Sequence, residues 1–385
     1  MYNFDKVVNR RNTNSAKWDM ETEDILPLWV ADMDFEVAPE ISKALRKRAE
    51  HPIYGYVKMS DEYYDSIINW VKRRHAWDIE KDWIVFSPGI VPGINLIVNA
   101  LTEPQDKVIL QTPVYYPFYG AIENNGCTVL KNPLKFENGR YEMDFEDLKE
   151  KLKDPKVKLM ILCSPHNPTG RVWTKDELTK LGELCLENNV TVISDEIHSD
   201  LIYEPNKHTP FASISDDFKN NSVVCISPSK TFNLAGLQIS SIIIPDEKVR
   251  RKVLKVMERS IPIWPNVFGI EASIAAYNEG EAWLNELMEY LNGNLKFLQE
   301  YINENMPKIK VIKPEGTYLV WLDFTSLNMA PKELKEFMLK NAKVWLDDGY
   351  IFGEEGNGFE RINIACPRST LKEALIRIKN ALNEK

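Results

Sequence analysis

The chain has 385 residues, a formal net charge of −9, and an ordinary globular composition with 44% hydrophobic and 27% charged residues. This length allows a large buried core and two domains. The negative charge argues against a general nucleic-acid surface, which needs a cationic face. No run of about eighteen apolar residues occurs, so no membrane-spanning helix is expected.

The N-terminus and the cysteines indicate where the protein works. The first residues, MYNFDKVVNRR, lack the apolar core of a signal peptide. The odd number of cysteines, without a CxxC pair, is typical of reduced thiols in a cytoplasmic enzyme. These cysteines are Cys127, Cys163, Cys185, Cys225 and Cys366.

The middle of the chain alternates short apolar runs with turns and amphipathic stretches. The runs are β-branched and continuous, as in strands buried on both faces. Thr174 and Glu177 have capping-box spacing and precede a helical apolar pattern. The runs lie at residues 108–110, 159–162, 190–193 and 223–226. We therefore expect an α/β fold with a mainly parallel sheet and helices on both of its faces.

The second half predicts a smaller α+β C-terminal domain. Residues 266–306 have a helical pattern, with interruptions expected at Gly280 and Gly293. Strands are predicted at residues 311–312, 318–321 and 361–364, and a final helix from Leu371. We divide the chain into an N-terminal segment, 1–50, a large domain, 51–280, and a small domain, 281–385. The N-terminal segment is expected to pack against the small domain or a second subunit.

Three polar groups follow successive apolar runs. Asn167 comes after 159–162, Asp195 after 190–193 and Lys230 after 223–226. If the sheet is parallel, these loops emerge at one edge, where ligands of such sheets collect. Singly, the lysine is typical of a surface position and the aspartate of a helix cap. Together they predict a site.

An amine, a carboxylate and an amide around one cavity suit pyridoxal phosphate. A lysine can hold this cofactor as a Schiff base and transfer protons, and a carboxylate keeps the ring nitrogen protonated. The phosphate needs backbone N–H groups at a helix N-terminus, which segment 87–93, before the apolar run 94–101, can supply. Ser227 and Ser229 add hydroxyls. Alone, segment 87–93 would be interpreted as an ordinary turn.

The sequence resembles the fold-type-I pyridoxal-phosphate enzymes, the aminotransferase-like group, from about Leu26 to the final helix. Within that group it is most similar to the C–S lyases of the cystathionine β-lyase type. The supporting segments are WVADMDF (29–35), YGY (54–56), TPVYYPF (112–118), NPTG (167–170), DEIH (195–198), SPSK (227–230), KTFNLAG (230–236) and ACPR (365–368).

The resemblance implies a role for each matched residue. Lys230 corresponds to the Schiff-base lysine, Asp195 to the pyridinium partner and Asn167 to the donor at the phenolic oxygen. Tyr115 corresponds to the ring that stacks on the cofactor, the alternative being a buried core tyrosine. The backbone N–H groups of Ile90 and Val91 correspond to phosphate donors.

Two further residues are matched at the edge of the site. Tyr56 corresponds to a tyrosine that reaches the neighbouring subunit's phosphate, which implies a homodimer with shared active sites. Tyr56 and Lys230 are both candidates for protonating the leaving sulfur. Arg368 corresponds to the arginine that binds the substrate α-carboxylate, the alternative being a surface ion pair.

Two positions depart from the transaminase pattern. His198 replaces a tyrosine. It either bonds the phenolic oxygen of the cofactor or has its hydrogen bonds satisfied by residues around the site without touching the cofactor. Gln238 replaces an arginine that touches the phosphate. Both departures agree with the lyase subgroup. Asp195, His198 and Asp200 lack a second histidine at i+4 spacing, so no metal site is expected.

The resemblance implies α,β-elimination of L-cystathionine or related cysteine S-conjugates to pyruvate, ammonia and a thiol, which is homocysteine from cystathionine. One alternative is an aminotransferase that uses the same Lys230. Another is a regulatory protein that retains pyridoxal phosphate and acts through a protein partner. A dehydrogenase is disfavoured because no GxGxxG segment follows a strand candidate.

Overall fold

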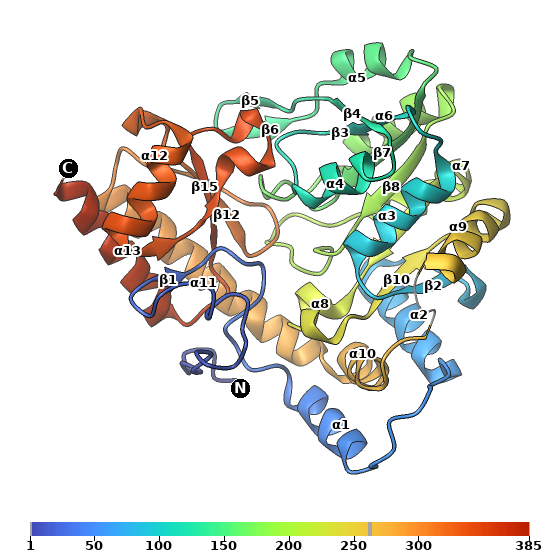
Figure 1. Cartoon of the computed structure of the whole chain (residues 1–385), viewed down its shortest axis with the longest axis horizontal. Coiled ribbons are helices and arrows are strands. Elements are labelled where there is room, and N and C mark those ends of the chain that lie inside the picture. The colour runs from blue at the N-terminus through green and yellow to red at the C-terminus, as the bar shows by residue number, and fades with distance from the viewer. Residues whose placement is uncertain (1, 261–263, 385) are drawn as a thin grey trace.

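The computed structural model describes residues 2–260 and 264–384, which form a large region around a seven-stranded sheet and a smaller C-terminal region (Figure 1). Within the described residues, β10 alone runs antiparallel to its neighbours in the large sheet. In spatial order the strands are β2 (Ile84–Ser87), β10 (Ser240–Ile243), β9 (Ser222–Ile226), β8 (Thr191–Asp195), β7 (Val157–Cys163), β3 (Lys107–Leu110) and β4 (Thr128–Lys131). The predicted mainly parallel sheet is confirmed.

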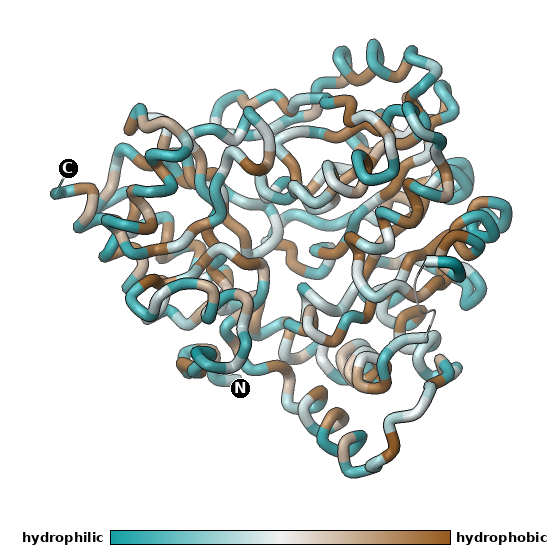
Figure 2. The backbone as a smooth tube through the Cα atoms, viewed as in Figure 1, coloured by the Kyte–Doolittle hydropathy of each residue, from teal (hydrophilic) through white to brown (hydrophobic). Residues whose placement is uncertain are grey.

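Helices cover both faces of this sheet because its strands are apolar on both sides. Val108 and Leu110 of β3 pack with α3 (Ile90–Leu101), α4 (Pro117–Glu123) and α9 (Glu247–Ser260). Ile109, between them, packs on the other face with α5, α6 and α7. These are α5 (Phe145–Leu152), α6 (Lys175–Glu187) and α7 (Asp216–Asn220). The outer helices alternate hydrophobic and hydrophilic residues (Figure 2).

The helical stretch after the sheet contains one predicted break and lacks the other. α10 (Val267–Glu279) and α11 (Glu281–Asn305) meet at Gly280, as expected. The expected interruption at Gly293 was wrong, because this residue lies inside α11. A helical glycine costs about 1 kcal/mol, which the buried leucines of α11 offset. A Cβ at position 293 would lie 3.0 Å from Arg368, so the glycine leaves room for that guanidinium.

The C-terminal region contains a four-stranded antiparallel sheet in the order β11-β12-β15-β14. Its strands are β11 (Lys310–Ile312), β12 (Leu319–Asp323), β15 (Phe359–Asn363) and β14 (Asp347–Asp348). The strands predicted there are confirmed, with ends that differ by one or two residues. α12 (Pro331–Glu336) follows β12, and the final helix, α13 (Arg368–Asn383), starts three residues earlier than predicted.

The N-terminal segment contacts both regions. β1 (Leu26–Pro27) pairs in parallel with β13 (Val344–Trp345), whereas α1 (Pro39–Ala49) packs against α10, beside α2 (Asp61–His75). A separate hairpin joins β5 (Lys135–Glu137) to β6 (Arg140–Glu142). The domain limits at residues 51 and 281 stay predictions. No helix in the described ranges is long and apolar enough to cross a membrane.

Candidate active site

The loops that leave β7, β8 and β9 meet at one cavity of about 200 Å³. Asn167 follows β7, Asp195 ends β8, and Lys230 lies in the short helix α8 (Pro228–Thr231) after β9. All three line this cavity. Its other lining residues include Ala31, Gly89, Ile90, Val91, Tyr115, Cys163, Ile197, His198, Ser229, Gln238 and Ser240. The parallel sheet therefore brings the amine, the carboxylate and the amide together.

The two predicted serines have different positions. Ser229 lines the cavity, but Ser227 is the N-cap of α8. The Ser227 hydroxyl accepts a hydrogen bond from the Ser229 backbone N–H at 3.1 Å and donates to the Ile239 carbonyl at 2.8 Å. Ser227 therefore holds the helix that carries Lys230 and does not itself line the cavity.

The Lys230 side chain is half-buried, and its amine is held by the backbone of the N-terminal segment. Its Nζ donates a hydrogen bond to the Ala31 carbonyl at 2.6 Å. Burial, with a smaller contribution from the nearby Arg361 guanidinium, lowers the pKa of this amine to about 8. The carboxylates of Asp32 and Asp195 oppose this shift. A lysine with such a pKa is partly neutral near physiological pH, and is therefore nucleophilic.

Asp195 lines the same cavity and is buried. One carboxylate oxygen accepts a hydrogen bond from the Ile197 backbone N–H at 3.1 Å. Burial, with a smaller contribution from the neighbouring Glu196, raises the pKa of the Asp195 carboxyl to about 7. A buried carboxylate of this kind gains most from a cationic partner such as a protonated ring nitrogen.

Two rings complete the wall. His198 lies edge-on to Tyr318, with ring centroids 6.0 Å apart. Burial, with the charges of Lys230 and Arg361, lowers the pKa of His198 well below its usual value, so this imidazole is neutral at physiological pH. Its Nδ1 has no hydrogen-bond partner among the described residues. Burial also raises the pKa of Tyr115 to about 12, which keeps its hydroxyl protonated.

The N-terminus of α3 forms another wall. Its N-cap is Gly89, which offers no side chain to its N–H groups. Ile90 and Val91 line the cavity, and Pro92 has no N–H group. Free N–H groups and the positive end of the helix dipole favour an anion here.

Two predicted residues lie elsewhere in this chain. The Tyr56 side chain is 98% exposed, in a segment without helix or strand. Arg368 begins α13, and its Nε donates a hydrogen bond to the Asn294 side chain at 2.6 Å. The Arg368 guanidinium also lies over the Phe297 ring at 4.9 Å. Packing of α13 on α11 therefore turns Arg368 away from the cavity, contrary to the expectation.

Arg361, which the sequence interpretation placed only in a strand, lies beside the site. It is buried in β15, and its Nη1 donates to the Asn167 side-chain oxygen at 2.8 Å. Its Nη2 donates to the Trp29 carbonyl at 3.0 Å and pairs with Asp347. The sequence contained a signal for this role, because an arginine within a buried strand requires polar or charged partners.

Family comparison agrees with this geometry. Residues 23–378 match the family described as Aminotransferase class I and II. The chain belongs to this family. It is 48% identical over 386 residues to cystathionine beta-lyase PatB of Bacillus subtilis, which covers 99% of this chain and 100% of PatB.

Two solved structures share the fold over both whole chains. A PLP-bound protein of Clostridium difficile 630, described provisionally as an aminotransferase, has a TM-score of 0.98 and 52% identity. The PLP-bound C–S lyase of Staphylococcus hominis has a TM-score of 0.93 and 36% identity. Both alignments cover 100% of each chain. The family assignment therefore extends to the complete fold.

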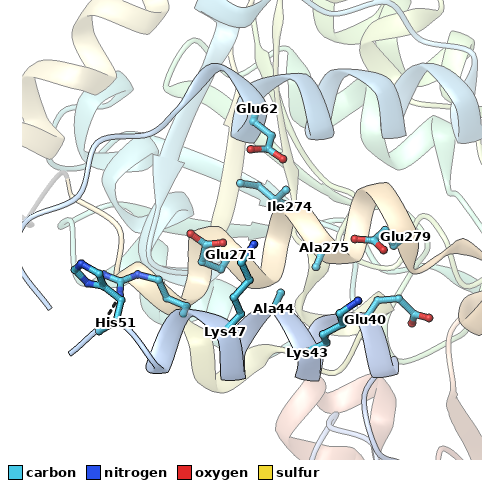
Figure 3. Close-up of a pocket in the computed structure, with 11 residues that line it drawn as sticks. Glu40, Lys43, Ala44, Lys47, His51, Glu62, Glu271, Ile274, Ala275 and Glu279 are labelled. Atoms are coloured by element: carbon cyan, nitrogen blue, oxygen red, sulfur yellow. Dashed lines mark hydrogen bonds between the residues drawn. The ribbon is translucent and has the colours of Figure 1, made fainter. Parts of the chain in front are cut away.

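A larger groove of about 630 Å³ lies between α1, α2 and α10 (Figure 3). Lys43 and Lys47 reach from α1 toward α10, which carries Glu271 and Glu279 (Figure 3). Both lysines and Glu279 are exposed. Exposed charges on neighbouring helices are typical of a solvated surface.

Proposed function

We propose that this protein is a pyridoxal-phosphate-dependent C–S β-lyase. Its reaction is the α,β-elimination of L-cystathionine or a related cysteine S-conjugate to pyruvate, ammonia and a thiol. The observation that carries this proposal is the meeting of Lys230, Asp195 and Asn167 at one cavity. The similarity to a protein named cystathionine beta-lyase selects the lyase within the family.

The residues of the cavity fit pyridoxal phosphate. When bound, this cofactor supplies an aldehyde that condenses with amines and a ring that accepts electrons from the substrate Cα. Lys230 would hold the aldehyde end and Asp195 the ring nitrogen. Tyr115 would cover the ring face. The N-terminus of α3, with Ser229, would hold the phosphate.

Lys230 is suited to act both as nucleophile and as base. With a pKa of about 8, roughly one amine in ten is neutral at pH 7, against fewer than about one in a thousand for an ordinary lysine. In its neutral form, Lys230 would be the group that joins to the cofactor aldehyde. Once free again, it would be the base that removes the substrate Cα proton. The α,β-elimination would release the β-thiolate. Lys230, now protonated, and Tyr56 remain the candidates for protonating the leaving sulfur.

The Asn167 side chain can contact both Arg361 and the cofactor. Its side-chain oxygen accepts from Arg361, which leaves its amide hydrogens to donate toward the phenolic oxygen of the cofactor. His198 is neutral and lines the same cavity, and it would offer a second polar contact to this phenolic oxygen. Asn167 would therefore lie between Arg361, with its bound substrate, and the cofactor ring.

Arg361, in place of Arg368, is our candidate for binding the substrate α-carboxylate. Its guanidinium is buried beside Asn167, and its Nε lacks a hydrogen-bond partner among the residues described. A buried unpaired donor is costly, and a carboxylate would satisfy it. Arg368 already contacts Asn294 and Phe297 outside the cavity.

The active unit in this proposal is a homodimer in the cytoplasm. The exposed apolar side chains of Ile53, Tyr54 and Tyr56 support a second subunit at this segment, with Tyr56 reaching the partner's phosphate. The cysteines are free and buried, which supports a reducing compartment.

The test is the reaction of purified enzyme with cystathionine in the absence of a keto acid. We expect pyruvate, ammonia and a free thiol in equal amounts. If turnover instead depends on an added keto acid, and that acid becomes an amino acid, the protein is an aminotransferase. If the protein binds pyridoxal phosphate but neither reaction occurs, a regulatory role replaces the proposal.

A further inference from the structure

Asp347 pairs with Arg361 inside the small sheet. The two residues are direct partners across β14 and β15, and Asp347 Oδ2 accepts from Arg361 Nη2. Their side chains are 6% and 2% exposed. Both are therefore shielded from water, where a charge-assisted hydrogen bond is strong and directional.

The guanidinium of Arg361 is held on several sides. Asn167 accepts from Nη1, the Trp29 carbonyl accepts from Nη2, and the Phe352 ring lies 4.9 Å from the guanidinium carbon. Asp347 provides the carboxylate among these contacts, and it comes from a strand that does not line the cavity. The free Nε fixes where an additional acceptor can approach.

We propose that Asp347 is a positioning residue, which orients Arg361 so that its free edge meets the α-carboxylate of the amino-acid substrate. This inference rests on the proposed role of Arg361. Asp347 does not touch the substrate and acts through Arg361 alone. It thereby makes the site selective for amino acids with a free carboxylate over their amides.

Two physical effects of Asp347 on substrate binding have opposite signs. As a negative charge near the bound carboxylate, it repels the substrate, so its removal would tighten binding. As an anchor, it holds the guanidinium in one orientation, so its removal would weaken binding. The direct contact, the burial of both side chains and their pairing across β14 and β15 favour the anchor.

The experiment measures binding by the cofactor absorbance change of the holoenzyme. L-Alanine is one ligand, because it has no β leaving group, and L-alaninamide is the other, because it has no carboxylate. We expect Asp347→Asn to weaken L-alanine binding about tenfold, as for one lost charge-assisted hydrogen bond, with L-alaninamide binding unchanged. With cystathionine, KM should rise and kcat should change little.

Asp348→Asn is the matched control. Asp348 is the next residue of β14, and its carboxylate pairs with Lys335 at 2.7 Å instead of Arg361. The Asp348→Asn variant should have the same ratio of L-alanine to L-alaninamide affinity as the wild type. If Asp347→Asn does not fold, Asp347→Glu keeps the charge but displaces it by one methylene, and should shift the same ratio in the same direction.

Tighter or unchanged L-alanine binding in the Asp347 variants would overturn the positioning role. Equal weakening of both ligands would also overturn it, because that result indicates general damage to the site. Arg361→Met separates this inference from the proposed function. If Arg361→Met keeps the preference for L-alanine, the role of Arg361 fails. If it loses the preference while Asp347→Asn keeps it, only the inference fails.

Discussion

The cavity at Lys230 and the groove between α1 and α10 are both lined by charged side chains, but they differ in how those charges are held. The cavity measures about 200 Å³; its carboxylate and the neighbouring guanidinium are buried, and its lysine is half-buried. The groove measures about 630 Å³, and its lysines are exposed. Burial changes the pKa of Lys230 and Asp195 toward neutrality, which prepares both for chemistry. Fixed, desolvated groups therefore mark the site better than volume does.

Removal of the Lys230 amine should give the largest effect. We expect Lys230→Ala to lose at least about 10⁴-fold in lyase activity, because nucleophile and base are lost together. Pyruvate release measures the activity, and the absorbance band of the lysine–cofactor imine should vanish with it. Steady-state activity near the wild-type level would remove Lys230 from both roles.

Asp195→Ala should have the next largest effect. Without the carboxylate, the ring nitrogen loses its partner, and we expect kcat/KM to fall about 10²- to 10³-fold with weaker cofactor retention. Dialysis followed by measurement of bound cofactor tests the second point. Glu196→Gln is the control: Glu196 is buried beside Asp195 but bonds Ser194, Phe211 and His208 instead of lining the cavity. Equal losses in both variants would contradict a specific role for Asp195.

The meeting of the three central site residues could be predicted from the sequence, whereas the arginine beside the site could not. Asn167, Asp195 and Lys230 could be placed together because parallel strands fix where their loops emerge. The choice between Arg361 and Arg368 depends on contacts between residues far apart in the sequence. Arg361 bonds Asn167 beside the cavity, whereas Arg368 bonds Asn294 of α11. Gly293 shows the same limit, since burial of α11 overrides its low helix propensity.

A smaller effect is expected from the carboxylate of Asp32, which raises the pKa of Lys230 against the effect of burial. In Asp32→Asn that opposition is lost, so the Lys230 pKa should fall below about 8. The rate at which the apoprotein binds pyridoxal phosphate should rise with pH through an inflection at the Lys230 pKa. This inflection should lie at lower pH in Asp32→Asn and at higher pH in Arg361→Met. Movement in the reverse directions would contradict the electrostatic description of the site.

The smallest effect should come from the groove. Lys47 lies on α1 and is exposed, so its charge is screened by solvent. We expect Lys47→Ala to change kcat/KM by less than about twofold, within the range of ordinary surface substitutions. A large loss of pyruvate release in this variant would show that the groove contributes to function and would weaken the contrast drawn above.

The most direct test of the account locates the lysine that carries the cofactor. The holoenzyme is treated with sodium borohydride, which converts a lysine–cofactor imine into a stable amine, and its peptides are then analysed by mass spectrometry. We predict a phosphopyridoxyl group on Lys230, in the peptide that also contains Ser227 and Ser229. Attachment to a different lysine, or no attachment in a protein that releases pyruvate from cystathionine, would contradict the account.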